Sequence, residues 1–219
     1  MENIAKYDLS RLFLRCLNAE YYTVENGGSF SLQKEGEKLY ILFEKSDGAI
    51  DWQNNFDFMA EKYDRACPRE CESWYVHNGF LKVWRSILPY INGAILDLEN
   101  REIVTVGYSH GAALALLCHE YVWYNRPDIR ATSVGYGFGC PRVVWGKVPK
   151  ERERWYNFLR VTNYDDIVTH LPPQKFGYRH VGRSITVGGV GRYSRLDAHR
   201  PENYIKELED MRRSRAIST

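Results

Sequence analysis

The 219-residue sequence has little that would place it in a membrane or divide it into several domains. Its longest purely apolar run, Ala112–Cys118, is much shorter than the roughly 20 residues that a membrane-spanning helix needs. It contains no repeat, no low-complexity segment and no long tract of Pro, Gly and Ser that could act as a linker. Because 44% of the residues are hydrophobic and 14% aromatic, we expect one globular domain over residues 1–219.

Cysteines are few, and their number is odd. Five cysteines cannot all pair within one chain, so at least one thiol stays free unless chains crosslink. Cys67 and Cys71 in CPREC could bridge each other or bind a metal, but no second Cys/His pair with zinc-ligand spacing lies nearby. We therefore expect free thiols, as in a reducing compartment.

A strong charge of either sign is absent too. The net charge of +2 does not favour a polyanionic partner such as nucleic acid, and the basic tail Arg212–Arg215 is typical of a solvated helix end. The first residues, MENIAKYDLSRLFLRC, lack the basic start, apolar centre and small-residue cleavage site of a signal peptide. These features predict a cytoplasmic protein.

Strand patterns and helix patterns alternate along the chain. The expected helices are Ile4–Cys16, Val76–Ile91, His110–Tyr124 and Arg200–Arg213. The expected strands are Lys38–Phe43, Arg101–Gly107, Thr132–Gly139, Tyr156–Asn163 and Ser184–Gly189. This alternation predicts an α/β fold, a mostly parallel central sheet with helices on both faces. Reactive groups in such sheets collect at the carboxyl ends of the strands.

One serine stands at such a strand end, between two glycines. The segment VTVGYSHGAAL passes from a strand pattern to a helix pattern at Ser109. A sharp strand-to-helix turn strains the residue at its apex and leaves no room for side chains two positions before and after it. Gly107 and Gly111 meet that requirement, so the Ser109 hydroxyl would project clear of the sheet. This placement predicts a nucleophile rather than an ordinary turn.

A nucleophilic serine needs a base to take its proton and an acid to orient that base. In this type of turn both partners follow the serine, the acid first. Asp165 and Asp166 both follow a predicted strand, and the residues themselves do not choose between them. Of the histidines that follow, His199 in the loop before the last helix is the preferred base. His180 is the second choice, although a histidine just before a strand is more often backbone-bonded, and His170 lies on the acid loop itself.

The developing negative charge on the substrate oxygen also needs hydrogen-bond donors. His110 begins the helix directly after the nucleophile, so its backbone N–H is aimed at that oxygen. The second donor should come from a loop after an early strand, and Phe43–Gly48 fits.

These segments together resemble the class 3 lipase family, the α/β-hydrolases that include the filamentous-fungal triacylglycerol lipases. The matching segments, in order, are YILFEKSDGAIDW, VHNGFLKVW, VTVGYSHGAALALL, YGFGCPRV, RVTNYDDIVTHLPP and HRPENYIKEL. The resemblance implies an α/β-hydrolase fold with the acid directly before Ile-Val, at Asp166, and the base at His199. It also implies that Ser46 is the first oxyanion donor, that the His110 N–H is the second, and that His77 is structural.

The sequence departs from the family pattern at several places. Lys45 stands where a glycine is usual, Tyr108 where a histidine is frequent, and Ala112 where a glycine is common. Lys45 matters most, because a long cationic side chain beside the acyl site could alter the choice of substrate. Residues 47–59 could form a lid like that of the fungal enzymes, or their aromatic side chains could belong to the core.

We therefore expect a carboxylic ester hydrolase that acts on acyl-lipid or similar apolar esters. Ser109, His199 and Asp166 would carry the reaction, without a metal or another cofactor, and the enzyme would touch a lipid surface transiently. Two alternatives stay open. One is a phospholipase, thioesterase or acyltransferase on the same triad, and the other is a catalytically silent member that binds lipid or a partner protein. The sequence does not indicate an oligomeric state.

Overall fold

The computed structural model describes residues 7–25, 27–44, 59–63, 74–147 and 152–217. Within these ranges a central sheet of seven strands has the order β1-β2-β3-β6-β7-β9-β11. The strands from β3 to β11 run parallel, while β1 and β2 are antiparallel at one edge. The bounds are β1 Tyr22–Thr23, β2 Ser29–Glu35, β3 Lys38–Phe43, β6 Glu102–Tyr108, β7 Val134–Phe138, β9 Phe158–Asn163 and β11 Arg183–Val187.

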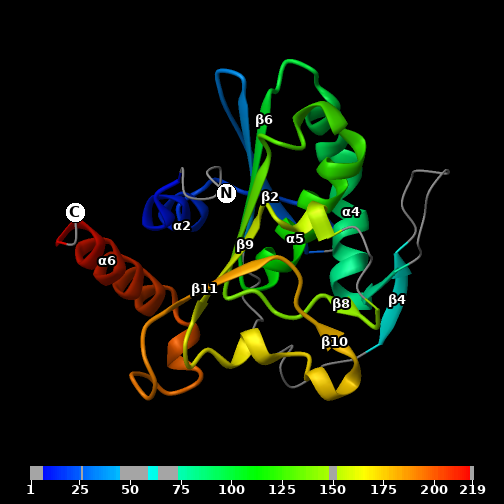
Figure 1. Cartoon of the computed structure of the whole chain (residues 1–219). Helices are drawn as coiled ribbons and strands as arrows, with labels where there is room; N and C mark the ends of the chain where they lie inside the picture. The colour runs from blue at the N-terminus through cyan, green and yellow to red at the C-terminus, as the bar shows by residue number, and fades with distance from the viewer. Residues whose placement is uncertain (1–6, 26, 45–58, 64–73, 148–151, 218–219) are drawn as a thin grey trace.

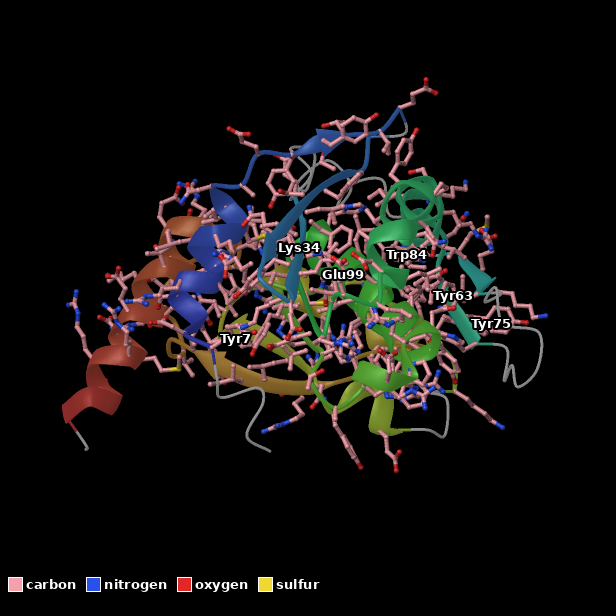
Figure 2. All side chains as sticks on the ribbon, turned by 90° about the horizontal axis from the view of Figure 1, so that it is seen from above. Tyr7, Lys34, Tyr63, Tyr75, Trp84 and Glu99 are labelled. Carbon is pink, nitrogen blue, oxygen red and sulfur yellow. The ribbon has the colours of Figure 1, made fainter. Side chains whose placement is uncertain are left out.

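Helices cover both faces of this sheet, as the sequence predicted (Figure 1). On one face, α2 (Leu9–Leu17) and α6 (Pro201–Ile217) lie side by side, and Figure 2 shows the same pair from above. On the other face, α5 (His110–Asn125) lies against the sheet and α4 (Asn78–Leu96) packs on α5. The central sheet therefore separates two apolar cores.

Strand β3 shows how the sequence builds both cores at once. Successive side chains of a strand point to opposite faces of the sheet. Leu39 and Ile41 accordingly lie in the core under α4 and α5, whereas Tyr40 and Leu42 lie in the core under α2 and α6. A run that is apolar at every position is what a strand buried on both faces requires.

A second, antiparallel sheet was not predicted. It has the order β10-β8-β5-β4 and consists of β4 Ala60–Tyr63, β5 Trp74–His77, β8 Val144–Trp145 and β10 Tyr178–Arg179. In Figure 2 the labelled Tyr63 and Tyr75 of this sheet lie at the edge of the molecule, beyond Trp84 of α4. Its strands are two to four residues long, and Tyr75 of β5 pairs with Trp145 of β8, 70 positions later, so no local pattern marks them.

The predicted helix Val76–Ile91 is wrong at both of its ends. Val76 and His77 belong to β5, where Val76 pairs with β4 and β8. Helix α4 begins at Asn78, because the His77 ring nitrogen Nδ1 accepts the N–H of Gly79 at 3.1 Å and caps the helix. The helix then continues through Pro89 to Leu96.

Candidate active site

Ser109 occupies a strained turn between β6 and α5. Its backbone has a φ of 57° and a ψ of −122°, and it is the one non-glycine residue with positive φ among those the structure describes. A Cβ atom on Gly107 would lie 2.0 Å from the carbonyl oxygen of Gly111, so the turn needs glycine there. Gly111 is needed for a different reason than the sequence suggested. A Cβ atom on it would lie 2.3 Å from the carbonyl oxygen of Phe43, on the neighbouring strand β3.

Three side chains from distant parts of the chain meet at this turn. The Nε2 atom of His199 lies 2.8 Å from the Ser109 hydroxyl oxygen. The Nδ1 atom of the same ring lies 2.8 Å from Oδ2 of Asp166. A carboxylate can only accept, so Nδ1 carries the ring proton and Nε2 is left to accept the hydroxyl proton of Ser109. This is the tautomer that a general base requires.

The carboxylate of Asp166 is fully buried and heavily hydrogen-bonded. Asp166 caps the short 3-10 turn Ile167–His170, and its Oδ1 accepts the N–H of Val168 at 2.8 Å. Its Oδ2 accepts the hydroxyl of Tyr204, from α6, at 2.6 Å in addition to the ring N–H of His199. Three donors compensate for the loss of water around the negative charge. The carboxylate is therefore suited to stabilise a cationic imidazole beside it.

Hydrogen bonds tie the loop that carries the base to the loop that carries the acid. The backbone N–H of Ile167 donates to the carbonyl of Arg195 at 3.3 Å, and the Asn163 side chain donates to the carbonyl of Ala198 at 2.9 Å. Gly139, at the end of β7, leaves the space that the pair occupies. A Cβ atom on it would lie 2.9 Å from Cε1 of His199 and 3.1 Å from Oδ2 of Asp166.

Tyr108 contacts the base twice. Its ring stacks on the imidazole of His199, with centroids 5.1 Å apart and planes 25° apart. Its hydroxyl donates a hydrogen bond to the backbone carbonyl of the same residue. Sequence reasoning noted Tyr108 only as a departure from the family pattern and assigned no role to Tyr204. The sequence feature that could have identified both is a tyrosine at a position that faces the core, Tyr108 in strand β6 and Tyr204 in helix α6.

The alternative candidates lie elsewhere. The Oδ2 atom of Asp165 accepts the backbone N–H of Arg192 at 3.1 Å and does not contact His199. The Nε2 atom of His180 donates to the carbonyl of Thr169 at 2.8 Å, so His180 is backbone-bonded. His170 is exposed. Of the predicted acids and bases, the structure brings only Asp166 and His199 to Ser109.

His110 is the first residue of α5, so no carbonyl within the helix can accept its backbone N–H. Its ring packs against Phe80, with centroids 5.4 Å apart. Burial, and the nearby His77, lower the pKa of the His110 ring to about 4, so the ring is neutral at pH 7. The predicted oxyanion donor Ser46 lies outside the described residues. So do Lys45, residues 47–58 of the possible lid, Cys67 and Cys71.

The cysteines that the structure describes are free and buried; they are Cys16, Cys118 and Cys140. In the same ranges, no three His, Cys, Asp or Glu side chains gather as a metal site would require.

Residues 40–176 match the family described as Lipase (class 3). The chain belongs to the class 3 lipase family. It is 27% identical to a lipase of Rhizomucor miehei over 66% of this chain and 40% of the relative. It is 29% identical to the secreted mono- and diacylglycerol lipase 1 of Fusarium solani over 70% of this chain and 45% of the relative.

The structure of the triacylglyceride lipase of Rhizomucor miehei superimposes with a TM-score of 0.67 and 21% identity, over 82% of this chain and 77% of that one. A triacylglycerol lipase whose catalytic centre is described as a serine protease triad superimposes with a TM-score of 0.65 and 24% identity, over 78% of this chain and 66% of that one. The predicted α/β-hydrolase fold is therefore confirmed.

The chain spans less than half the length of these two curated relatives. The relatives also correct one prediction, that of a cytoplasmic protein. Two of those with matching sequences, from Fusarium solani and Penicillium cyclopium, are named secreted lipases. The prediction rested on the composition of the first residues, which does not determine where a protein of this family works. Among the helices that the structure describes, none has the length and apolar character to cross a bilayer.

Proposed function

We propose that this chain is a serine carboxylic ester hydrolase that acts on acyl-lipid or other apolar esters. The observation that carries the proposal is the unbroken chain of hydrogen bonds from the Ser109 hydroxyl through the His199 ring to the buried carboxylate of Asp166. Two relatives named mono- and diacylglycerol lipases support partial glycerides as the first substrates to test.

In the proposed mechanism, the Ser109 oxygen attacks the ester carbonyl while its proton passes to Nε2 of His199. Asp166 holds the ring and stabilises its positive charge. The backbone N–H of His110 and a donor at Ser46 stabilise the oxyanion, each contributing roughly 3–4 kcal/mol to the transition state. His199 then protonates the leaving alcohol, and a water molecule activated by the same ring releases the acid from Ser109. None of these steps uses a metal or another cofactor.

The test is a panel of substrates combined with covalent labelling. A fluorophosphonate probe should modify Ser109 in the native chain and leave the S109A variant unmodified. Among tributyrin, monoacylglycerol, a phospholipid and an acyl-CoA, we expect the glycerides to be hydrolysed fastest. Faster phospholipid or thioester cleavage would instead assign the same triad to a phospholipase or thioesterase. A native protein that stays unlabelled would be a silent, lipid- or protein-binding member.

Tyr108 should support this reaction as a positioning residue. Its ring face lies against an imidazole that becomes cationic in the transition state, an arrangement worth about 0.5–2 kcal/mol. We expect Y108L to lower kcat about tenfold with little change in KM. Y108F keeps the ring and loses the hydrogen bond to the His199 carbonyl, so its loss should be only a few-fold. Steady-state kinetics on p-nitrophenyl butyrate measures both. A Y108L variant with native kcat would show that the stack has no part in the reaction.

A further inference from the structure

Several basic side chains gather behind the acid loop, away from the three residues described above. Arg160 lies on β9, and its Nε donates to the carbonyl of Val181 at 2.9 Å. Arg142 follows β7, and its Nη1 donates to the carbonyl of Pro172 at 3.0 Å and to that of His170. The segment from β9 to β11 that supplies these carbonyls leaves the sheet, reaches β10 and returns (Figure 1). The two arginines thus bond to the same return segment, and their charges lie near enough to affect each other.

Both arginines are partly buried, and neither pairs with a carboxylate of the described residues. Burial lowers the pKa of both guanidinium groups, and the positive charge of Arg142 lowers that of Arg160 further. Both charges, after burial, also lower the pKa of His180, to about 3. In the described part of the chain, no carboxylate forms an ion pair with Arg142 or Arg160. Moving a charge out of water is costly unless it is paired, so two partly buried arginines without a carboxylate favour an anionic partner.

Other buried arginines of this chain do have such partners. Arg126, which is almost fully buried, donates to the carboxylate of Asp128 at 2.8 Å. Arg154, equally buried, lies 3.1 Å from a carboxylate oxygen of Glu120. Arg142 and Arg160 therefore lack the carboxylate partner that these two fully buried arginines have.

Arg142 and Arg160 also have donors that the fold does not use. Two groups of donors bond to nothing within the described residues: Nη1 and Nη2 of Arg160, and Nε and Nη2 of Arg142. None of these atoms is among the fully buried polar atoms that lack a partner. Ser184 of β11 is in register with Arg160 on the neighbouring parallel strand, so their side chains share a face of the sheet. Ser184 is exposed and adds a hydroxyl beside the guanidinium.

We propose that Arg160 and Arg142 form a binding site for a phosphate group, with the hydroxyl of Ser184 as a further donor. A planar guanidinium fork donates two parallel hydrogen bonds to the oxygens of a phosphate, which is why arginine prevails at such sites. A second guanidinium and a hydroxyl suit the remaining oxygens of a tetrahedral anion. The phosphate could be free in solution or part of a phospholipid headgroup.

The site adjoins the proposed active site without sharing a residue with it. The Thr169 hydroxyl donates to the backbone carbonyl of Asp166 at 2.8 Å, while the carbonyl of Thr169 accepts from His180 in the cluster. A phosphate bound to the arginines would thus sit behind the segment that holds the acid. The proposal concerns binding alone, so it stands or fails independently of the hydrolytic activity.

Calorimetric titration of the full chain with inorganic phosphate tests the site, in a buffer whose only other anion is chloride. We expect saturable binding that R160Q and R142Q each weaken at least tenfold. R160K keeps the charge and loses the fork, so it should weaken binding to a smaller degree. If R160Q fails to fold, R160K replaces it in the comparison. The matched control is R130Q, because Arg130 is also partly buried and its Nε also donates to a carbonyl, that of Trp123.

A second titration identifies the source of the phosphate. Dihexanoylphosphatidylglycerol, used below its micellar concentration, presents the phosphate on a lipid, and dihexanoylglycerol, the same lipid without the phosphate, is the control. Both are titrated into the S109A variant, which cannot hydrolyse their esters. Tighter binding of the phospholipid than of inorganic phosphate would assign the site to a headgroup, and equal affinities would assign it to free phosphate. The proposal is overturned if neither phosphate probe gives saturable binding. It is also overturned if R160Q, R160K and R142Q bind like the native chain, or if R130Q loses binding to the same extent.

Discussion

The S109A variant should lose ester hydrolysis by a factor on the order of 10⁶ in kcat while keeping its fold. Removing the hydroxyl removes the atom that attacks, and the His199 ring then has no proton to accept. Binding of the substrate and the oxyanion donors would leave a residual rate that is still above that of water. Steady-state kinetics on p-nitrophenyl butyrate, together with circular dichroism of the variant, measures this outcome.

Two further variants separate the chemistry of Ser109 from its effect on folding. S86A is a control, because the Ser86 hydroxyl bonds to the carbonyl of Val83 within α4, and we expect native activity from it. S109G should be as inactive as S109A but more stable by about 1–2 kcal/mol, because glycine relieves the strain of a positive φ. Urea unfolding compares the two. An S109A variant with more than a hundredth of the native kcat would rule out Ser109 as the nucleophile.

The strands of the central sheet were readable from the sequence because each has its own apolar pattern. The strand Lys38–Phe43 was predicted with both ends correct, since a strand buried on both faces has an almost continuous apolar run, here Leu39–Phe43. The turn at Ser109 was readable for a related reason, because its requirement for glycine is local. Strand β2 was missed, since its outer residues are polar and exposed and its pairing with β3 is decided by tertiary contact.

The part of the site that depends on chain order and on neighbouring residues was predictable from the sequence. His199 and Asp166 could be chosen because the family pattern fixes their neighbours. The stacking of Tyr108 on His199 could not, because it joins residues 91 positions apart and depends on how the last loop folds over β6. The clustering of Arg142 with Arg160 was also beyond the sequence. Each is an ordinary arginine in its own segment. Only the folded chain shows that the two charges lie near each other and that no carboxylate of the described residues pairs with them.

The neighbouring aspartates Asp165 and Asp166 offer the sharpest test of which carboxylate orients the base. D166N should lower kcat about 10⁴-fold, whereas D165N should stay within about threefold of the native value. At Asp166, Oδ1 accepts the N–H of Val168, so the amide nitrogen of an asparagine would take the place of Oδ2 and face His199. A donor there forces the ring into the tautomer with its proton on Nε2, which cannot accept the proton of Ser109.

At Asp165 the same substitution keeps an amide oxygen that can still accept the backbone N–H of Arg192. The two variants have the same change of charge and atom count at adjacent positions, so a difference between them reports contact with the ring. Values of kcat for p-nitrophenyl butyrate across pH 6–9, with thermal unfolding of both variants, complete the comparison. Equal losses in D165N and D166N, or a D166N variant above a tenth of native kcat, would mean that a different group orients His199. The buried carboxylate would then have only a structural part, as the cap of the turn Ile167–His170.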